Sequence, residues 1–90
     1  MEDEPTLYTF DIGGGADGSY WMLDGMLHRE DGPALTTTYG VKQWFIHGVL
    51  HREDGPAIEW DNGSKEWWLN GVQYEPMKWL LKLHELKNAA

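Results

Sequence analysis

The sequence predicts a mostly β fold: an antiparallel meander of three stacked β-hairpin units of about 23 residues, followed by a C-terminal capping α-helix. Two observations predict the stack. Residues 27–34 recur almost unchanged as residues 50–57, and the same offset relates Trp21, Trp44 and Trp67. A short fixed period is typical of units that bury their apolar faces on their neighbours.

The turn residues, a third observation, divide each period into strands. Gly25, Gly48 and Gly71 each follow a polar residue, and glycine adopts without cost the positive φ that a two-residue hairpin requires. Residues 39–40 and 61–64 predict a second turn in each unit. Short β-like runs lie between the turns, at residues 34–38, 42–46, 57–60 and 65–69. A Glu-Asp-Gly-Pro corner closes the unit, outside the ladder or at its edge because proline has no N–H to donate.

The three units cover residues 2–29, 30–52 and 53–74 of one domain. The first is irregular, because residues 2–7 match the later corners only partly and a glycine-rich turn at 13–18 replaces a tight one. Atypical terminal copies are what a capped stack needs.

Residues 75–88 predict the helix. Pro76 suits the first helical position, and Lys82 and Lys87 lie toward the negative end of the helix dipole. Two apolar sets recur at helical spacing: Met77, Leu80, Leu81 and His84, and Trp79, Leu83 and Leu86. We expect this helix to cap the last unit and to protect a sheet edge or an open core. A helix that binds a partner is the alternative.

The charge favours a protein partner with a basic surface. The 90 residues carry a net charge of −8, and residues 1–74 alone carry −9. Such a field repels nucleic acid and anionic lipid, so we expect neither as a direct partner. Simple solubility of an acidic protein is the alternative explanation.

Composition also limits the compartment and the cofactors. The chain has no cysteine, which excludes a disulfide framework and a thiolate metal site and permits a reducing compartment. The acidic first residues and the lack of a long apolar run predict neither a signal peptide nor a membrane helix. We therefore expect a cytoplasmic protein, in the host cytoplasm if it is viral, with no cofactor.

Alternation along the strands predicts two unlike faces. The expected core column contains the three repeat tryptophans together with Leu7, Leu23, Leu35, Ile46, Ile58 and Leu69. The opposite column contains Met22, Phe45 and Trp68, flanked by Tyr20, Gln43 and Glu66. This column is too apolar for a plain solvent face, so it is a candidate partner-binding surface. Coverage by the helix or by a second copy of the chain is the alternative.

His28 with Asp31, and His51 with Asp54, have residue types that ligate metals or transfer protons. Identical repeats also place the same side chains in register, so a ladder that satisfies backbone groups at the corners explains them without chemistry. We favour the structural interpretation, with no catalytic and no metal site. For the same reason, we expect Arg29 and Arg52 to pair with neighbouring carboxylates. The triple glycine at 13–15 lacks the lysine of a phosphate loop.

Residues 44–51 resemble the MORN family (membrane occupation and recognition nexus), whose units of about 23 residues are β-hairpins with an aromatic residue, a turn glycine and a later histidine. The closer likeness, over about residues 2–74, is to a MORN-like variant with His-Arg-Glu-Asp-Gly-Pro-Ala, associated with bacteriophage, large-virus and bacterial proteins. The usual pattern has His-Gly where this chain has His-Arg, at 28–29 and 51–52. That departure and the acidic charge argue against the membrane binding that the resemblance implies.

These observations favour a non-enzymatic protein-binding module, of the kind that serves as a phage inhibitor of a host protein. A defence nuclease, in an anti-CRISPR role, or another nucleic-acid-handling protein could be blocked sterically and electrostatically. The acids expected to contact such a partner are Asp31, Glu53, Asp54, Glu59, Asp61 and Glu66. The alternative is an assembly module that forms a homodimer through sheet edges or the aromatic column. A metalloprotein and a lipid-binding protein are further alternatives.

Overall fold

The computed structural model describes residues 4–11 and 17–89, and it is mostly β with one C-terminal helix, as predicted. The elements of this part are β1 (Thr6–Phe10), β2 (Gly18–Leu23), β3 (Met26–Leu27), β4 (Leu35–Thr37), β5 (Lys42–Gln43), β6 (Phe45–Ile46), β7 (Val49–Leu50), β8 (Ile58–Glu59), β9 (Lys65–Leu69), β10 (Val72–Tyr74) and α1 (Pro76–Asn88). Most of the glycine-rich turn predicted at 13–18, and the start of the first predicted unit, lie outside the described residues.

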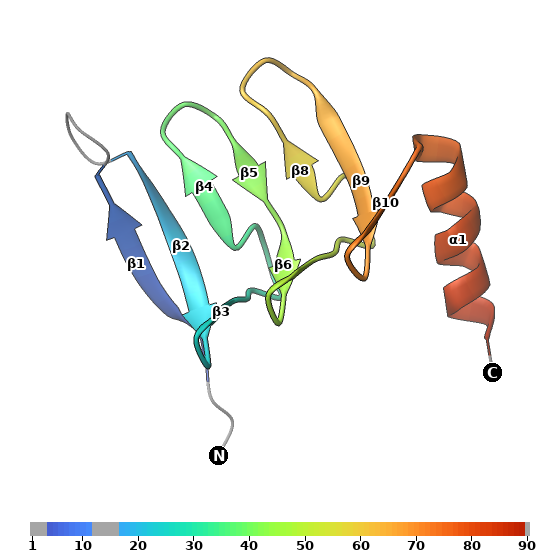
Figure 1. The fold of residues 1–90 in the computed structure, drawn as a ribbon, viewed down its shortest axis with the longest axis horizontal. Helices are drawn as coiled ribbons and strands as arrows, with labels where there is room; N and C mark the ends of the chain where they lie inside the picture. The colour runs from blue at the N-terminus through green and yellow to red at the C-terminus, as the bar shows by residue number, and fades with distance from the viewer. Residues whose placement is uncertain (1–3, 12–16, 90) are drawn as a thin grey trace.

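The strands form an antiparallel meander in the order β1-β2-β4-β5-β8-β9-β10, with β3 paired to β2 and with β6 and β7 paired to each other. Figure 1 shows the hairpins side by side in a row, with α1 beside β10 at the end of the row. Backbone bonds join the lower parts of neighbouring hairpins, because the N–H of Arg29 donates to Phe45 and that of Arg52 donates to Trp68. The sheet is therefore continuous along the row, with two strands for each 23-residue period.

The tight turns have the backbone geometry that the glycines predicted. At positions 24–25, 47–48 and 70–71, the first residue has a φ of 48–52° and the glycine a φ of 78–81°. Positive φ at both central residues defines the type I′ turn, whose twist matches that of the flanking strands. Residues 24, 47 and 70 are Asp, His and Asn, the side chains that tolerate this conformation best after glycine.

The predicted strand at 42–46 is interrupted at Trp44, which separates β5 from β6. The backbone of Trp44 remains paired, because its N–H donates to Ala57 O at 2.8 Å and its carbonyl accepts from the His51 N–H at 3.1 Å. The chain thus changes partners at this residue rather than leaving the sheet. The runs predicted at 34–38 and 57–60 are shorter strands, β4 and β8, and the fully buried Ala34 and Ala57 precede them.

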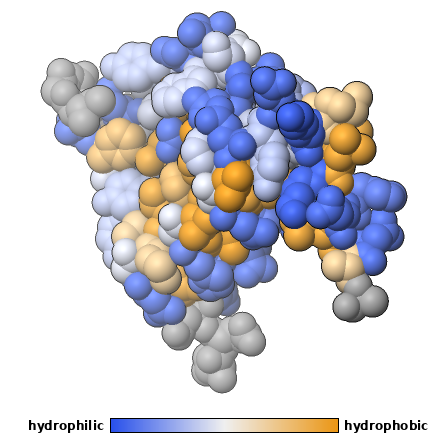
Figure 2. Space-filling model, turned by 45° about the vertical axis from the view of Figure 1, so that its right-hand side comes forward, coloured by the Kyte–Doolittle hydropathy of each residue, from blue (hydrophilic) through white to orange (hydrophobic). Residues whose placement is uncertain are grey.

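The sheet is one layer thick, so the buried core is small. The molecule measures 46 × 40 × 16 Å and has a radius of gyration of 14.2 Å, against about 12 Å for a compact domain of this length. The buried apolar residues of the described part are Ala34, Ala57, Ile58, Leu69 and Trp79. Figure 2 shows other apolar residues gathered in the middle of the visible face and on the helix, open to solvent.

The predicted core column is wrong about the face of Leu35 and Ile58 and about the burial of Leu7, although Ile58 is buried as predicted. The register aligns Leu35 with Tyr20, and Ile58 with Glu66, so both side chains point away from the repeat tryptophans. Leu7 does align with Trp21, but β1 is the edge strand and leaves Leu7 47% exposed. The error arose because alternation within one strand cannot fix the register between strands.

Helix α1 caps the row through one aromatic contact. Trp79 is buried, and its ring lies 4.8 Å from the ring of Trp67 between centroids. Pro76 begins the helix after Glu75, whose side chain makes no capping hydrogen bond. The capping function predicted for the helix is confirmed by this contact with β9. Over the described residues, no helix is long and apolar enough to cross a membrane.

Candidate functional site

The sheet has two faces of different character. We call the face that carries the rings of Trp21, Trp44 and Trp67 the grooved face. The opposite side, the aromatic face, carries Tyr8, Tyr20, Met22, Leu35, Phe45, Ile58, Glu66 and Trp68, which share it by register and alternation. The predicted binding residues therefore lie on both faces. The aromatic ones are on the aromatic face, and the corner acids Asp31, Glu53 and Asp54 border the grooved face.

On the grooved face, an arginine covers each of the first two repeat tryptophans. The guanidinium carbon of Arg52 lies 3.7 Å from the ring centroid of Trp44, and that of Arg29 lies 4.9 Å from that of Trp21. A guanidinium over an indole is held by the ring quadrupole as well as by packing. The position eight residues after Trp67 is Glu75, and there the ring of Trp79 provides the cover instead.

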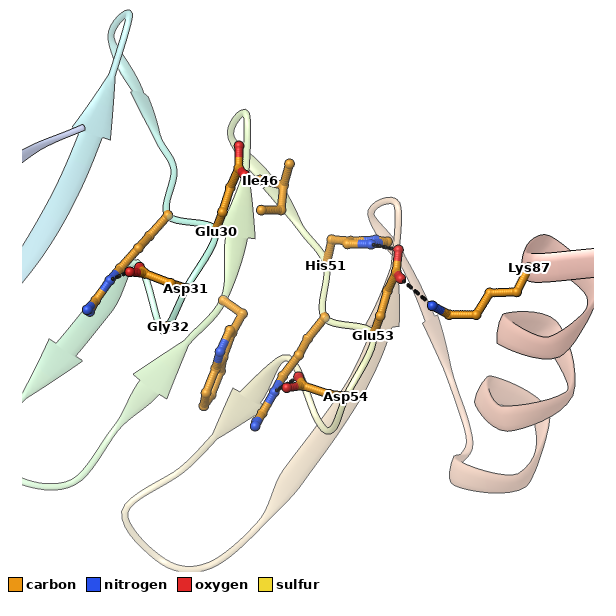
Figure 3. Close-up of a pocket in the computed structure, with 11 residues that line it drawn as sticks. Glu30, Asp31, Gly32, Ile46, His51, Glu53, Asp54 and Lys87 are labelled. Atoms are coloured by element: carbon orange, nitrogen blue, oxygen red, sulfur yellow. Dashed lines mark hydrogen bonds and ion pairs between the residues drawn. The ribbon is translucent and has the colours of Figure 1, made fainter. Parts of the chain in front are cut away.

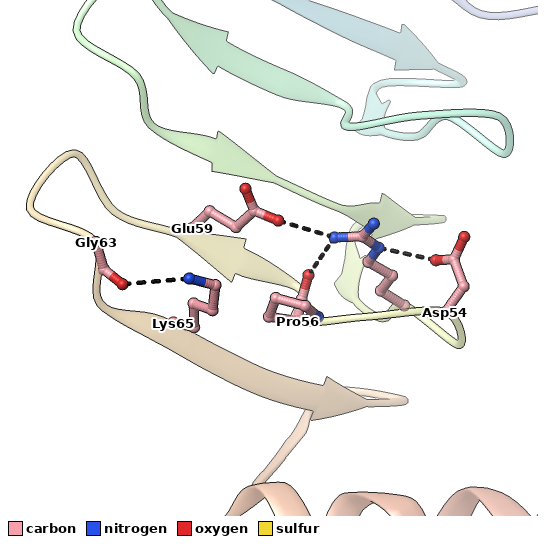
Figure 4. A network of polar contacts seen from close by, with 6 residues as sticks. Asp54, Pro56, Glu59, Gly63 and Lys65 are labelled. Atoms are coloured by element: carbon pink, nitrogen blue, oxygen red, sulfur yellow. Dashed lines mark hydrogen bonds and ion pairs between the residues drawn. The ribbon is translucent and has the colours of Figure 1, made fainter.

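Each arginine is oriented by fixed acceptors. Arg52 Nε donates to Asp54 Oδ1 at 2.8 Å, and its NH1 donates to Pro56 O at 2.9 Å and to Glu59 Oε2 at 3.1 Å. Figure 4 shows Asp54, Pro56 and Glu59 converging on this one guanidinium. Arg29 repeats the first two contacts with Asp31 and Pro33, at 3.0 and 3.3 Å. The predicted pairing of these arginines with neighbouring carboxylates is thereby confirmed.

The histidines tie each corner to the tight turn of the next hairpin. His28 Nδ1 accepts the His47 N–H at 2.8 Å, and His51 Nδ1 accepts the Asn70 N–H at 2.9 Å. The Nε2 atoms face glutamates, at 3.4 Å for Glu30 and 3.0 Å for Glu53. The histidines therefore hold the sheet together by satisfying backbone groups, and their carboxylate partners are these glutamates rather than the aspartates that the sequence suggested.

Between these ladders, the grooved face contains two hollows related by the 23-residue period. The upstream groove, with a volume of about 760 Å³, is lined by Trp21, Leu23, His28, Arg29, Glu30 and Asp31 among others. The downstream groove, of about 720 Å³, is lined by the equivalent Trp44, Ile46, His51, Arg52, Glu53 and Asp54. Figure 3 shows the downstream groove, with Asp31 and Asp54 on its sides and Lys87 reaching it from α1. One unit thus contributes one groove.

The corners make the rims of these grooves acidic. Each corner places one arginine beside one glutamate and one aspartate, and at the second corner Lys87 of α1 adds a positive charge by pairing with Glu53. Asp31 and Asp54 are 87% and 85% exposed, so their outer oxygens face solvent. The hydrogen bond from Arg52 holds the pKa of Asp54 below its usual range, and bonds from His51 and then Lys87 do the same for Glu53. Both carboxyls are charged at neutral pH.

The remaining predicted acids differ in availability. Glu59 is half-buried and bound by Arg52, and Glu66 accepts from the indole N–H groups of Trp60 and Trp68 at 2.7 and 3.0 Å. Internal donors therefore already engage both acids, which leaves fewer of their oxygen lone pairs for a partner. Asp61 is exposed, but it lies in the turn at the other end of the hairpins from the corners. Glu53 is 49% exposed and shared with His51 and Lys87.

On the aromatic face, the predicted residues are half-buried rather than prominent. Tyr20 stacks on Tyr8 with 5.5 Å between ring centroids, and Tyr20 and Met22 border a hollow of about 480 Å³ near β1. Phe45 and Trp68 lie further along the row. The helix does not cover this face at its main contact, since Trp79 packs on Trp67 of the grooved face.

The sequence interpretation missed two exposed acids of the grooves: Glu4, which lines the upstream groove, and Glu30, which is 80% exposed beside Asp31. The 23-residue offset from Glu53, which was included, is the signal that would have found Glu30. It also missed Lys87, whose ion pair with Glu53 at 3.1 Å joins α1 to the second corner and leaves no trace in the local sequence. No group of three or more metal-ligating side chains occurs within residues 4–11 and 17–89.

Comparisons with protein-family models, with curated proteins and with solved structures returned no match to this chain.

Proposed function

We propose that this chain is a non-enzymatic protein-interaction module that binds the basic surface of another protein on its grooved face. One observation carries the proposal: two equivalent hollows lie side by side, each lined by a repeat tryptophan under its arginine and by an acidic rim whose aspartate is almost fully exposed. The arginine and histidine side chains of this face, by contrast, make hydrogen bonds within the sheet.

The net charge supports the same partner class. A charge of −8 on a small, flat molecule attracts a basic surface at long range and so raises the association rate. The fixed corner carboxylates would then determine how the partner is positioned on the face. Blocking the basic nucleic-acid channel of a host enzyme, the inhibitor function suggested by the sequence, is one use of such a surface. A molecule only 16 Å thick could lie flat over such a channel.

The test is an affinity capture with three matched baits: the wild type, Asp31→Asn/Asp54→Asn, and Phe45→Ala/Trp68→Ala. The proposal expects one basic protein that is retained by the wild type and by the aromatic-face variant, lost by the corner variant, and released by salt. Binding then has to be reproduced with the purified partner. Retention by the corner variant with loss by the aromatic-face variant would move the site to the other face and contradict the proposal.

A second candidate function is assembly through self-association. The observation that favours it is the edge strand β1, where Leu7 and Tyr8 are each 47% exposed and the sheet continues on one side only within the described residues. An unprotected edge without charged residues is a template for pairing with a second copy. Sedimentation velocity at micromolar concentration would show a dimer that Leu7→Lys abolishes. A monomer at all concentrations would exclude this function.

A further inference from the structure

The spacing of the two grooves defines the shape of ligand that fits them. Each 23-residue period contributes two strands to the row, and the corner segments are bonded directly to the next hairpin, since Gly48 N–H donates to Leu27 O and Gly71 N–H donates to Leu50 O. Neighbouring strands lie about 4.8 Å apart, so equivalent points on consecutive corners lie about 9.6 Å apart across the sheet. The exposed aspartates of the two corners, Asp31 and Asp54, therefore recur at about this distance.

A polyproline II helix has the same period. It rises about 3.1 Å per residue with three residues per turn, so side chains three positions apart point in the same direction about 9.3 Å from each other. An extended β-strand lacks this property, because residues three apart point to opposite sides. Of these two extended forms, the polyproline form is the one that offers a cation to each corner from one side of the ligand.

The floors of the grooves suit the remaining residues of such a ligand. Trp21 with Leu23, and Trp44 with Ile46, form the apolar part of the two linings. Polyproline ligands dock on aromatic-lined grooves, where their low conformational entropy before binding favours affinity. Because Arg29 and Arg52 cover the two indoles, proline rings would lie against Leu23 and Ile46 beside them, while the ammonium groups of the lysines reach Asp31 and Asp54.

We infer that the grooved face binds a proline-rich basic segment in the polyproline II conformation, with Lys or Arg at every third position, laid across the hairpins along the acidic rim. This inference rests on the proposed function and specifies its ligand. We expect one cation for each corner, because each corner presents one aspartate that is more than 80% exposed.

Two labelled peptides of identical composition test the spacing: (Lys-Pro-Pro)₄ and (Lys-Lys-Pro-Pro-Pro-Pro)₂. The second contains no two lysines three positions apart. Fluorescence anisotropy at low salt is expected to show about fivefold tighter binding of the first peptide, the effect of matching two exposed ion pairs rather than one. The preference should disappear in Asp31→Asn/Asp54→Asn and persist in the control Asp61→Asn/Glu85→Gln, which changes the net charge equally.

The outcomes separate this inference from the proposed function. Equal affinity for the two peptides, both weakened by the corner variant, would overturn the polyproline spacing and leave the basic-partner function in place. A preference that survives in the corner variant would show that the rim is not the site and would overturn the inference. Binding of neither peptide would also overturn it, and the capture experiment would then decide the proposed function independently.

Discussion

His28 shows how single residues hold this thin sheet together. It is 2% exposed, and its Nδ1 is the acceptor for the N–H of His47, a residue whose positive φ points that group away from the strand ladder. The pairs His28–Glu30 and Arg29–Asp31 both join residues two apart, as an extended backbone dictates. In each corner, the histidine thus accepts a hydrogen bond from the N–H of a tight turn, and the arginine covers an indole ring.

Replacing His28 with Ala should destabilise the fold by about 2 kcal/mol, because it leaves the His47 N–H without its acceptor and opens space in the sheet. His28→Asn should recover part of this loss, since its Oδ1 can occupy the place of Nδ1. Urea denaturation of both variants, with the exposed His84→Ala as control, measures the effect. A cost for His28→Ala no larger than that of His84→Ala would contradict the assigned function of this histidine.

The corner carboxylates make stability depend on pH. Hydrogen bonds from His51 and Lys87 lower the pKa of Glu53 below its ordinary value of 4.5, so the folded state binds its proton less readily than the unfolded state. The stabilisation is present above pH 4.5 and is lost as the pH falls through the lowered pKa. The difference in unfolding free energy between wild type and Glu53→Gln should therefore shrink as the pH falls below 4.5 in a series of urea titrations. A difference that is constant from neutral pH to pH 3 would exclude this linkage.

At the scale of elements, α1 completes a series that the arginines begin. Arg29 and Arg52 cover the first two repeat tryptophans, and Trp79 covers the third from the first turns of the helix. Its indole Nε1 has no hydrogen-bond partner among the described residues, so packing alone fixes it. The ion pair between Lys87 and Glu53 adds a second, exposed attachment near the other end of the helix.

Trp79→Ala should cost about 3 kcal/mol and undock the helix, because a large buried side chain is lost from a small core. Trp79→Phe should cost much less, since it keeps an aromatic ring on Trp67 and removes the unpaired N–H. Leu81→Ala on the outer side of the same helix is the matched control, expected within about 0.5 kcal/mol of wild type. Thermal and urea unfolding followed by far-ultraviolet circular dichroism would test all three; equal effects of Trp79→Ala and Leu81→Ala would refute the cap.

The features that sequence predicted at this scale are those set by local chemistry. Gly25, Gly48 and Gly71 marked the tight turns, and Pro76 marked the helix start, because each backbone requirement involves adjacent residues only. The positions of Leu35 and Ile58 were not predictable in the same way, since the register between strands depends on partners far apart in the chain. The ion pair of Lys87 was unpredictable for the same reason, because its partner Glu53 is distant in the chain. Glu30, in contrast, is predictable from its 23-residue offset to Glu53.

For the molecule as a whole, thinness and charge act together. A sheet 16 Å thick leaves few charges far from water, and its acids outnumber its bases by eight. Short ion pairs at the corners offset some of this excess, but the remaining carboxylates repel one another across the sheet. Net repulsion of this kind weakens the folded state and is reduced by salt.

Raising sodium chloride from low to about 0.5 M should therefore raise Tm, by roughly 5 °C for about 1 kcal/mol of relieved repulsion. The variant Asp61→Asn/Glu85→Gln, with a smaller net charge, should show a smaller rise. Differential scanning calorimetry measures both. A Tm that falls with salt would mean that the corner ion pairs dominate the electrostatics, against this expectation.

The contact of Trp79 with Trp67 has a consequence for how such a chain changes length over generations. The cap recognises the ring of the last tryptophan, and each earlier ring is covered from within its own 23-residue period. A duplication of one such period in the gene would therefore leave both ends of the protein as they are. It would add one groove and one exposed corner aspartate without a new fold.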